Sequence, residues 1–486
     1  MKVRITVIFL MLSFILCACS DKVSDKNISH ASNTAEATDT EPDDGVDKHD
    51  IEKSDYEGRD FTFVTWDDFS TNKYFFCEES SGDILETACF DRNLAVEEYL
   101  NIKLVNIGIP NPGTEARWAS FIQSDIMSGD GAYDIVLNSW YLGIFEMVTG
   151  NMLFDWNDVP YIDLSKNYWN QTLNETLAIQ GVLFVAAGDY IPANSRCLVY
   201  NKQLQIDYNL PNFNEVVFSG NWTLDKFIEY SNAVTSDVDG DGKFTVADYY
   251  GFSLYCDYNL QEFFVAADMD TVYINEDGDL TITPLNEKIV NLISKLRDFF
   301  AKDSVYTYHW RDAAELQMDF ADGHTLFSDT STDELEQLRT MEVDFGVLPI
   351  PKYDENQKNY VSLAGSYYLL VPRSVKDIEL VGKTAELLNH YSRKIYRPAY
   401  FDVALTGKYI RDNESEAVLE ILFDTARYDA GFIYGAYNPF SYNMMQFLYS
   451  DSKAEVASYY RANIDRIQKS IYDKINEAVR AYKEES

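Results

Sequence analysis

Basic residues are scarce in this sequence of 486 residues. It contains 40 lysines and arginines against 79 aspartates and glutamates, which gives a formal net charge of −39 at pH 7. A surface this negative repels phosphate backbones and anionic headgroups, so the charge argues against nucleic acid as a partner. It suits a neutral or cationic ligand, although the simplest role of such a charge is to keep an exposed protein soluble.

The common catalytic motifs are absent as well. The sequence has no HExxH and no GxSxG motif, and Gly382-Lys383-Thr384 lacks the earlier glycine of a phosphate-binding loop because Asp377 takes its place. A glycosidase needs only two carboxylates, which a chain this acidic always offers. We therefore assign no catalytic residue and expect no enzyme, with a surface-anchored glycan-active enzyme as the alternative. Of the five histidines, His30 and His49 lie in a polar stretch near the start of the chain. His309, His324 and His390 are isolated in the sequence, so we interpret each as a surface or packing residue rather than a catalytic base.

Long apolar runs are missing except at the start of the chain. The run from Ile5 to Leu16 follows Lys2 and Arg4, and it is too short to span a bilayer but has the length of a signal-peptide core. The following Leu16-Cys17-Ala18-Cys19 resembles a bacterial lipobox. This resemblance implies a signal peptide over residues 1–18 and a lipid on Cys19 that anchors the protein to the extracellular face of the cell membrane. An ordinary secretory signal is the alternative.

Cysteine and aromatic residues are also unevenly supplied. Outside the signal peptide, four cysteines remain. Because export permits disulfides, three ways of pairing Cys77, Cys89, Cys197 and Cys256 remain open.

Between Asp21 and Asp55 the chain has no aromatic residue and no leucine, but eleven acidic residues against four lysines. Such a composition cannot bury enough apolar surface to offset the entropy of ordering, so we predict a disordered acidic tether over residues 19–57.

The remaining residues, about 430 of them, are too many for a single core and indicate two lobes. Strands expected at 60–66, 102–107, 132–137 and 182–187 alternate with helices expected at 84–100 and 119–127. This alternation predicts βαβ units in an α/β fold whose ligands bind beyond the carboxyl ends of the strands. Asp277-Gly278 predicts a hairpin, Thr223 a helix N-cap, and the chain after Ile378 is mostly helical.

Six segments share an order and spacing with a known family. They are Phe63-Val-Thr-Trp66, Ala95 to Ile102, Tyr133-Asp-Ile-Val136, Leu198 to Lys202, Gly220 to Asp225, and Asp344 to Lys352. In these the chain resembles family 1 extracellular solute-binding proteins of bacterial ABC importers, the type that includes maltodextrin-binding protein. The resemblance implies a monomer that delivers a sugar or oligosaccharide to permease subunits. A partner membrane sensor or a non-sugar solute is the alternative.

The same resemblance implies a periplasmic-binding-protein-like fold with an interlobe cleft that closes by a hinge. Lobe one would comprise 58–192 plus 365–407, and lobe two 193–364 plus 408–486. The chain would cross between them near Tyr190–Asn194, Ser362–Gly365 and Thr406–Lys408.

By position in the family pattern, aromatic, carboxylate and amide side chains should face the cleft. Aromatic rings cover the apolar face of a sugar, while carboxylates and amides bond its hydroxyls. For each Trp or Tyr, core packing is the alternative. The candidates are Trp66, Asp67, Asp68, Asn138, Trp140, Tyr141, Asp189, Tyr190, Asn194, Tyr255, Asp257, Tyr258, Phe327, Ser328, Asp329, Tyr367 and Tyr368.

The most specific local motif lies between Asp237 and Asp248. Oxygen-bearing side chains recur there at the spacing of an EF-hand-like calcium loop, with Gly242 at the sharp turn and aspartate in place of the usual final glutamate. We expect a structural calcium ion, with an acidic surface turn as the alternative. The ligands would be Asp237, Asp239, Asp241, Lys243 through its carbonyl, Thr245 and Asp248.

Overall fold

A computed structural model describes residues 45–66, 74–77, 82–109, 115–139, 142–191, 194–255, 260–308, 320–365, 367–405, 410, 412–435 and 455–485. Cys19, Asp67, Asp68, Trp140, Tyr141, Asp257 and Tyr258 lie outside these ranges, as does the third predicted crossing. Within the described residues, no helix is both long enough and apolar enough to cross a bilayer.

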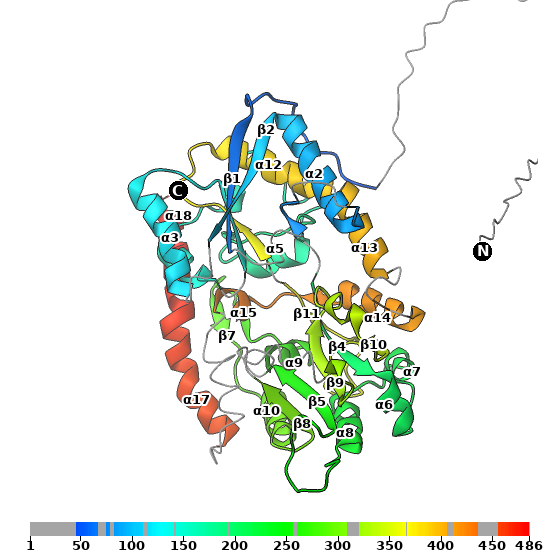
Figure 1. Cartoon of the computed structure of the whole chain (residues 1–486). Coiled ribbons are helices and arrows are strands. Elements are labelled where there is room, and N and C mark those ends of the chain that lie inside the picture. The colour runs from blue at the N-terminus through cyan, green and yellow to red at the C-terminus, as the bar shows by residue number, and fades with distance from the viewer. Residues whose placement is uncertain are drawn as a thin grey trace, which may run out of the picture. The chain divides into compact units, whose positions relative to one another are not determined.

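The first lobe is built on a four-stranded sheet (Figure 1). Its strand order is β12-β3-β1-β2, in which β1 pairs in parallel with both β2 and β3, and β12 is antiparallel to β3. These strands confirm the predicted parallel βαβ start of the chain. Their bounds are β1 Arg59–Trp66, β2 Ile102–Ile109, β3 Ile135–Ser139 and β12 Tyr367–Leu370.

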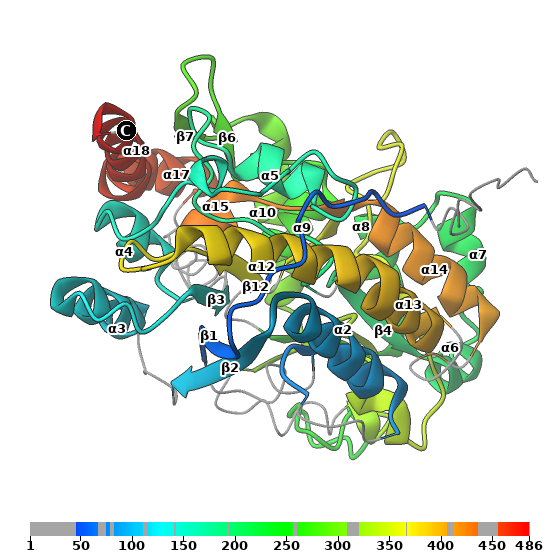
Figure 2. The same ribbon diagram turned by 90° about the horizontal axis from the view of Figure 1, so that it is seen from above.

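Helices α2, α12 and α13 pack against one another in the first lobe, as Figures 1 and 2 show. Asp83 caps α2 by accepting hydrogen bonds from the backbone of Leu85 and Glu86, and Asp377 caps α12. The helices of this lobe are α2 Ile84–Leu100, α3 Glu115–Ser128, α4 Ile144–Thr149, α5 Gln171–Leu177, α12 Ile378–Tyr391 and α13 Arg397–Leu405. Short turns η1 Trp156–Asp158 and η4 Ser392–Tyr396 lie among them.

The second lobe is built on a five-stranded mixed sheet of order β10-β4-β9-β5-β8. Strand β4 is antiparallel to both β10 and β9, whereas β5 runs parallel to β9 and β8. A hairpin of β6 and β7 turns at Gly278, as predicted, with a φ of +81°. The strands are β4 Arg196–Asn201, β5 Tyr250–Tyr255, β6 Val272–Ile274, β7 Leu280–Ile282, β8 Val305–Tyr308, β9 Thr325–Ser331 and β10 Phe345–Leu348.

The helices of the second lobe are short apart from α8, α10, α14 and α17. Thr223 caps α8, as predicted, by accepting a hydrogen bond of 3.4 Å from the backbone of Lys226. The helical elements are α6 Lys202–Asp207, α7 Phe213–Phe218, α8 Leu224–Val234, α9 Leu260–Ala266, α10 Glu287–Phe300, η3 Gln337–Thr340, α14 Asn413–Asp424, α15 Ala430–Tyr434 and α17 Val456–Ile467.

The chain passes from the first sheet to the second between β3 and β4, and returns between β10 and β12. Just before the return, β11 Ser362–Leu363 pairs with β13 Ala426–Arg427. Gly365 follows with a φ of +119°, and a Cβ there would lie 2.2 Å from the hydroxyl oxygen of Tyr368. Only glycine fits at this turn.

Residues 182–187 do not form the predicted strand. They are buried, but Ala186 only exchanges a pair of backbone hydrogen bonds with Leu369, of 3.1 and 2.8 Å. The apolar run reflects burial between neighbouring elements, and composition alone does not separate such a segment from a strand.

The folded part begins before residue 58, which corrects the predicted end of the tether. Ile51 is 5% exposed, and the backbone of Ser54 and Tyr56 donates hydrogen bonds to Tyr99 and Leu100 at the end of α2. The ring of His49 packs edge-on against His390, with centroids 4.7 Å apart. A few contacts with the first lobe order residues 45–57. A prediction from the average composition of the segment does not detect such single contacts.

The last helix contacts both lobes. Helix α18 Asp473–Glu485 follows α17 through the π-helical segment η5 Gln468–Tyr472, and it packs against α4 of the first lobe and β7 of the second. Tyr482 donates a hydrogen bond of 2.9 Å to Asp158, and Arg373 forms an ion pair of 3.1 Å with Glu485. Asn476 of the same helix exchanges hydrogen bonds of 2.9 and 3.0 Å with the backbone of Leu280 on β7, so α18 contacts both lobes and its predicted place in lobe two stays a prediction.

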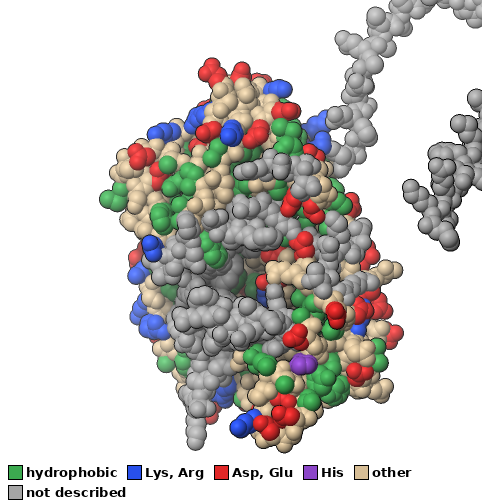
Figure 3. Space-filling view, viewed as in Figure 1, with side chains coloured by type: hydrophobic (Ala, Val, Ile, Leu, Met, Phe, Trp, Pro, Cys, Tyr) green, Lys and Arg blue, Asp and Glu red, His purple; other side chains and the backbone are tan. Residues whose placement is uncertain are grey.

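Acidic side chains are scattered over both lobes in Figure 3, as the net charge of −39 requires. The same face is hollowed near its middle.

Candidate functional site

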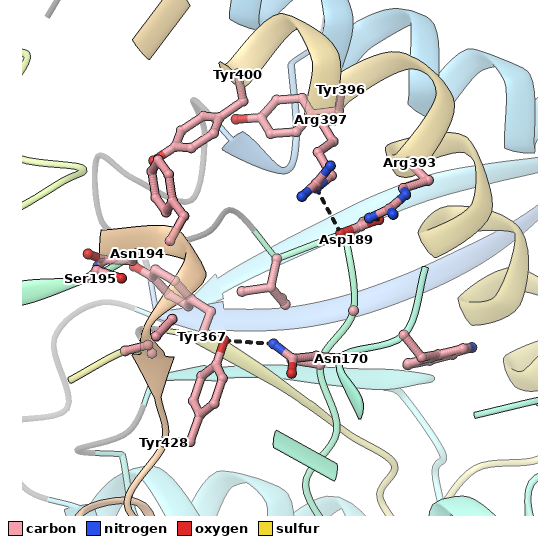
Figure 4. A pocket seen from close by; sticks show the side chains of 18 of the residues that line it. Asn170, Asp189, Asn194, Ser195, Tyr367, Arg393, Tyr396, Arg397, Tyr400 and Tyr428 are labelled. Atoms are coloured by element: carbon pink, nitrogen blue, oxygen red, sulfur yellow. Dashed lines mark hydrogen bonds and ion pairs between the residues drawn. The ribbon is translucent and has the colours of Figure 1, made fainter. Parts of the chain in front are cut away.

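A pocket of about 250 Å³ opens where the chain crosses between the two sheets (Figure 4). This crossing pocket is close to the lower end of the volumes of small-molecule sites, about 300–1,000 Å³. Its walls come from both crossings, the start of α5, η4, α13, the end of α14 and β13. The lining residues are Asn167, Trp169, Asn170, Ala187, Gly188, Asp189, Ile191, Asn194, Ser195, Ala364, Gly365, Tyr367, Arg393, Tyr396, Arg397, Tyr400, Phe401, Phe423, Ala426 and Tyr428.

Asp189 lies beside two arginines at one side of the pocket (Figure 4). Arg393 donates a hydrogen bond of 3.0 Å from Nη1 to Oδ2, and Nε of Arg397 lies 3.5 Å from Oδ1. The two arginines are four residues apart, which brings their side chains to the same face of a helix. Burial raises the pKa of Asp189, and the two guanidinium charges oppose that shift.

Arg397 is held by an aromatic ring as well as by charge. Its guanidinium lies 4.5 Å from the ring centroid of Phe401. Burial lowers the pKa of Arg397, Asp189 opposes that shift, and the like charge of Arg393 adds to it. The arrangement keeps a planar cation at the pocket wall with part of its side chain, 43%, still exposed.

Two polar atoms of the pocket wall are buried without a hydrogen-bond partner among the described residues. They are the hydroxyl of Tyr396, a residue 1% exposed, and Oδ1 of Asn194. Buried polar atoms are nearly always paired in folded proteins, so an orphan donor and an orphan acceptor at a pocket wall indicate groups that a ligand satisfies. On another wall, Asn170 donates a hydrogen bond of 2.8 Å to the hydroxyl of Tyr428.

Aromatic rings make up much of the remaining surface. Tyr396 and Tyr400 stack with centroids 6.2 Å apart and an interplanar angle of 22°. Trp169, Tyr367 and Phe401 add further rings to the lining. Flat aromatic faces together with nearby amide, carboxylate and guanidinium groups can contact both the C–H face and the hydroxyls of a sugar.

Contacts beneath the pocket fix these rings in place. Glu386 of α12 accepts hydrogen bonds from Nε1 of Trp169 at 2.8 Å and from the hydroxyl of Tyr168 at 2.6 Å. The buried guanidinium of Arg92 lies 4.6 Å from the ring centroid of Tyr190 and 5.1 Å from that of Tyr396. The pocket wall is therefore preorganised by the helices of the first lobe.

Of the residues predicted to face the cleft, the structure brings Asp189, Asn194 and Tyr367 together in the crossing pocket. Trp66 ends β1 half-buried and outside the pocket lining, and Tyr255 ends β5. Both, like the six candidates beyond the described ranges, keep their ligand role only as a prediction.

The other predicted residues are buried inside the protein and lie outside the pocket lining, so their ligand role stays a prediction. Asn138 accepts a hydrogen bond of 2.6 Å from Nε1 of Trp118, and Ser328 pairs with Ser253 at 2.9 Å. Asp329 forms an ion pair with Arg196. The rings of Tyr190, Phe327 and Tyr368 are fully buried in the core. These side chains are buried in the core beside the sheets. The position of a residue at the end of a strand does not by itself tell which face of the sheet its side chain takes.

Sequence reasoning missed the contribution of the segment from Arg393 to Phe401. It was predicted only as part of a helical tail, yet it supplies Arg393, Tyr396, Arg397 and Tyr400 to the pocket. The pattern that points to it is a helix face on which arginine and tyrosine each recur after four residues.

The predicted calcium loop brings three of its carboxylates together. Oxygens of Asp237, Asp239 and Asp248 all lie within 4.8 Å of one another. Asp237 accepts hydrogen bonds from the backbone of Gly240 and Gly242, at 2.7 and 2.8 Å. The loop is thus wound around its first aspartate.

The far end of the loop returns to the same cluster. Asp248, 1% exposed, accepts backbone hydrogen bonds of 2.8 Å from Val238 and Thr245. These bonds lower its pKa, that from Thr245 most strongly. Asp241 lies outside the three-carboxylate cluster and accepts from the backbone of Lys243 at 2.7 Å.

The sequence matches no protein-family model and none of the curated proteins. The structure, in contrast, is similar to many solved ones. The ABC substrate-binding protein Lmo0181 of Listeria monocytogenes, solved with cycloalternan, matches with a TM-score of 0.56 at 15% identity, over 85% of this chain and 99% of its own.

Two further structures match in the same way. The GacH receptor of Streptomyces glaucescens, solved unliganded and with acarbose, has a TM-score of 0.53 at 14% identity, over 84% of this chain and 99% of its own. A cyclo/maltodextrin-binding protein with maltotetraose has a TM-score of 0.53 at 16% identity, over 88% and 98%. The chain therefore has the two-lobed α/β fold of these binding proteins.

Proposed function

We propose that this chain is an extracellular substrate-binding protein that delivers a sugar or oligosaccharide to an ABC importer. The observation that carries the proposal is the crossing pocket, because aromatic rings, a carboxylate and two orphan polar atoms converge there in a two-lobed fold. The neighbours named above bind saccharides in related architectures, which supports the same ligand class.

Export and anchoring belong to the same proposal. Cleavage before Cys19 and lipidation of its sulfur would hold the protein at the outer face of the membrane, where a second acyl chain makes anchoring stable. The protein would act there as a monomer, close its lobes on the ligand by bending at the crossings, and dock on the permease subunits.

The test is calorimetric titration of the exported full chain, in mild detergent, with a panel of mono- and oligosaccharides. We expect saturable binding of one glycan class with no product formed, and loss of affinity in Asn194→Ala but not in the surface control Asn221→Ala. Turnover of any glycan would favour the enzyme instead. Absence of binding across the panel would overturn the proposed ligand class.

We also propose that residues 237–248 bind a structural calcium ion. The ligands would be the carboxylates of Asp237, Asp239 and Asp248, with Asp241, the Lys243 carbonyl and Thr245 completing an oxygen shell. Three carboxylates this close repel one another without a cation, which supports the proposal. The ion would stabilise the second lobe and take no part in ligand binding.

A further inference from the structure

The charge inside the crossing pocket is opposite to that of the protein. The chain as a whole carries −39, which by itself suits a neutral or cationic ligand. The charged residues that line the pocket, within the described part of the chain, are Asp189, Arg393 and Arg397. Two guanidinium groups against one carboxylate leave one positive charge in excess.

The excess charge is concentrated on Arg397. Arg393 already donates a hydrogen bond of 3.0 Å to Asp189, whereas Arg397 only approaches Asp189 with Nε, at 3.5 Å. Its Nη1 and Nη2 atoms have no acceptor among the described residues, although Phe401 holds the guanidinium plane in place. A fixed guanidinium with a free edge is the group that pairs with a carboxylate through two parallel hydrogen bonds.

We propose that the pocket selects an acidic saccharide whose carboxylate pairs with Arg397, an inference that rests on the proposed function. One excess positive charge matches the single negative charge of a uronate better than a phosphate monoester, which carries about −1.5 to −2 at pH 7. The orphan hydroxyl of Tyr396 and Oδ1 of Asn194 would then bond the hydroxyls of the same sugar. Tyr400 would cover its apolar face.

The arrangement assigns separate tasks to the two arginines. Arg393 keeps Asp189 in place and neutralises it, so it acts as a positioning residue. Arg397 contacts the ligand and determines specificity. An acidic ligand also relieves the mutual repulsion of the two arginines, one of the influences that lower the pKa of Arg397.

The experiment compares matched ligands on matched variants. A trisaccharide that carries a single uronate, its neutral methyl ester, and neutral maltotriose are titrated into the exported full chain, into Arg397→Gln and into Arg480→Gln. The last variant removes the same charge from α18, where Arg480 contacts Asp279 outside the pocket. Thermal unfolding of each variant verifies that it is folded, and Arg397→Lys retains the charge without the planar fork.

We expect the wild-type protein to bind the acid at least tenfold more tightly than the ester, which corresponds to about 1.4 kcal/mol. Arg397→Gln should lose that preference, Arg397→Lys should retain part of it, and Arg480→Gln should keep it. The preference should also weaken as salt is added, because charge pairing at a partly open site is screened.

Equal or tighter binding of the neutral oligosaccharides would overturn the acidic specificity and leave the proposed function standing. A preference for the acid that survives Arg397→Gln in a folded protein would overturn the role of Arg397. Absence of binding by every saccharide, acidic or neutral, would overturn the proposed function itself and this inference with it.

Discussion

Arg196 on β4 and Asp329 on the neighbouring strand β9 are joined by a hydrogen bond of 2.5 Å between Nη2 and Oδ1. The Asp329 side chain is 1% exposed, and Arg196 also donates to Glu262 at 2.8 Å. Burial raises the pKa of Asp329, and the Arg196 charge opposes that shift. Arg196 therefore joins β4 to β9 through Asp329 and connects the second sheet to α9 through Glu262.

Replacing Asp329 by alanine should therefore destabilise the protein without abolishing ligand binding. Removing one member of a buried ion pair costs about 3–5 kcal/mol, and we expect the lower end because Arg196 keeps Glu262. Urea denaturation measures the change, with the exposed Asp303→Ala as the control. A stable variant that no longer binds any ligand would instead assign Asp329 to the ligand site.

The stability of the first lobe should depend on pH through Glu386. Burial raises the pKa of this carboxyl above its usual value, and the hydrogen bonds from Tyr168 and Trp169 oppose that shift. The folded state then holds a proton that the unfolded state has already lost. The stabilising contribution of this protonation is complete below the unfolded pKa, about 4.3, and is lost as the pH rises through the higher folded value.

Glu386→Gln removes this titration. As the pH rises from 4 toward neutrality, the free energy of unfolding of the wild-type protein should therefore fall relative to that of the variant. Urea denaturation at a series of pH values measures the difference. A difference that stays constant over that range, or that changes in the opposite direction, would contradict the prediction.

Tyr396→Phe should separate binding from stability. The hydroxyl is buried with no partner among the described residues, so its removal costs the folded protein nothing and can increase its stability. If the hydroxyl bonds a ligand, affinity should fall by about 0.5–1.5 kcal/mol. Calorimetry and thermal unfolding on the same variant measure both effects. Tyr460→Phe, which removes a hydroxyl bonded to the Thr283 carbonyl outside the pocket, should show the reverse, with lower stability and unchanged affinity.

Calcium should raise the unfolding temperature, and a chelator should lower it. Asp248→Asn keeps the shape of the side chain but removes a carboxylate from the three-residue cluster, so the calcium response should be lost. Ligand affinity should be unchanged, because the cluster residues do not line the crossing pocket. An equal calcium response in the wild-type protein and the variant would place the ion elsewhere.

Cys77 and Cys89 should form a disulfide when the exported protein meets an oxidising thiol–disulfide exchange partner. The two thiols share a hydrogen bond, and Arg92 donates to Cys89 Sγ at 3.3 Å. Burial raises the pKa of Cys89, but the bond from Cys77 and the charge of Arg92 outweigh burial and bring it to about 6. Cys77 is partly exposed and Cys89 is fully buried, so Cys77 would form the mixed disulfide with the exchange partner, and Cys89 would then displace the partner's thiol to close the Cys77–Cys89 bond.

Peptide mapping of the non-reduced protein measures this pairing. Cys197 provides the internal control, since burial raises its pKa and it should stay reduced. Recovery of Cys77 and Cys89 as separate alkylated thiols after oxidation would contradict the prediction.

The sequence predicted the local structure well wherever one residue type determines it. Thr223 caps α8 and Gly278 turns the hairpin because few other residues satisfy those positions. The parallel start of the first sheet followed from the alternation of apolar runs. Segments whose order depends on distant contacts were predicted less well, notably Ile51, which is buried against the folded lobe beside an acidic stretch.

The site was predicted only in part for a related reason. Asp189, Asn194 and Tyr367 lie on the crossings, whose positions follow from the order of the elements. Phe327 and Asp329 occupy equally plausible strand positions, but their neighbours bury them, and strand periodicity does not give the identity of a neighbour. Arg393 and Arg397 reach the pocket through the packing of η4 and α13 on α2. The recurrence of arginine and tyrosine marks their helix face, but it does not give the element against which that helix packs.

The C-terminal helices have a mechanical consequence for binding. Helix α17 packs on α10 of the second lobe and α18 on α4 of the first, so the two lobes are joined by this helical strut in addition to the crossings. A strut outside the crossing pocket would limit how widely the lobes open in the proposed hinge motion. Because apparent affinity scales with the fraction of molecules in the binding-competent conformation, residues around η5 can tune ligand capture without contacting the ligand.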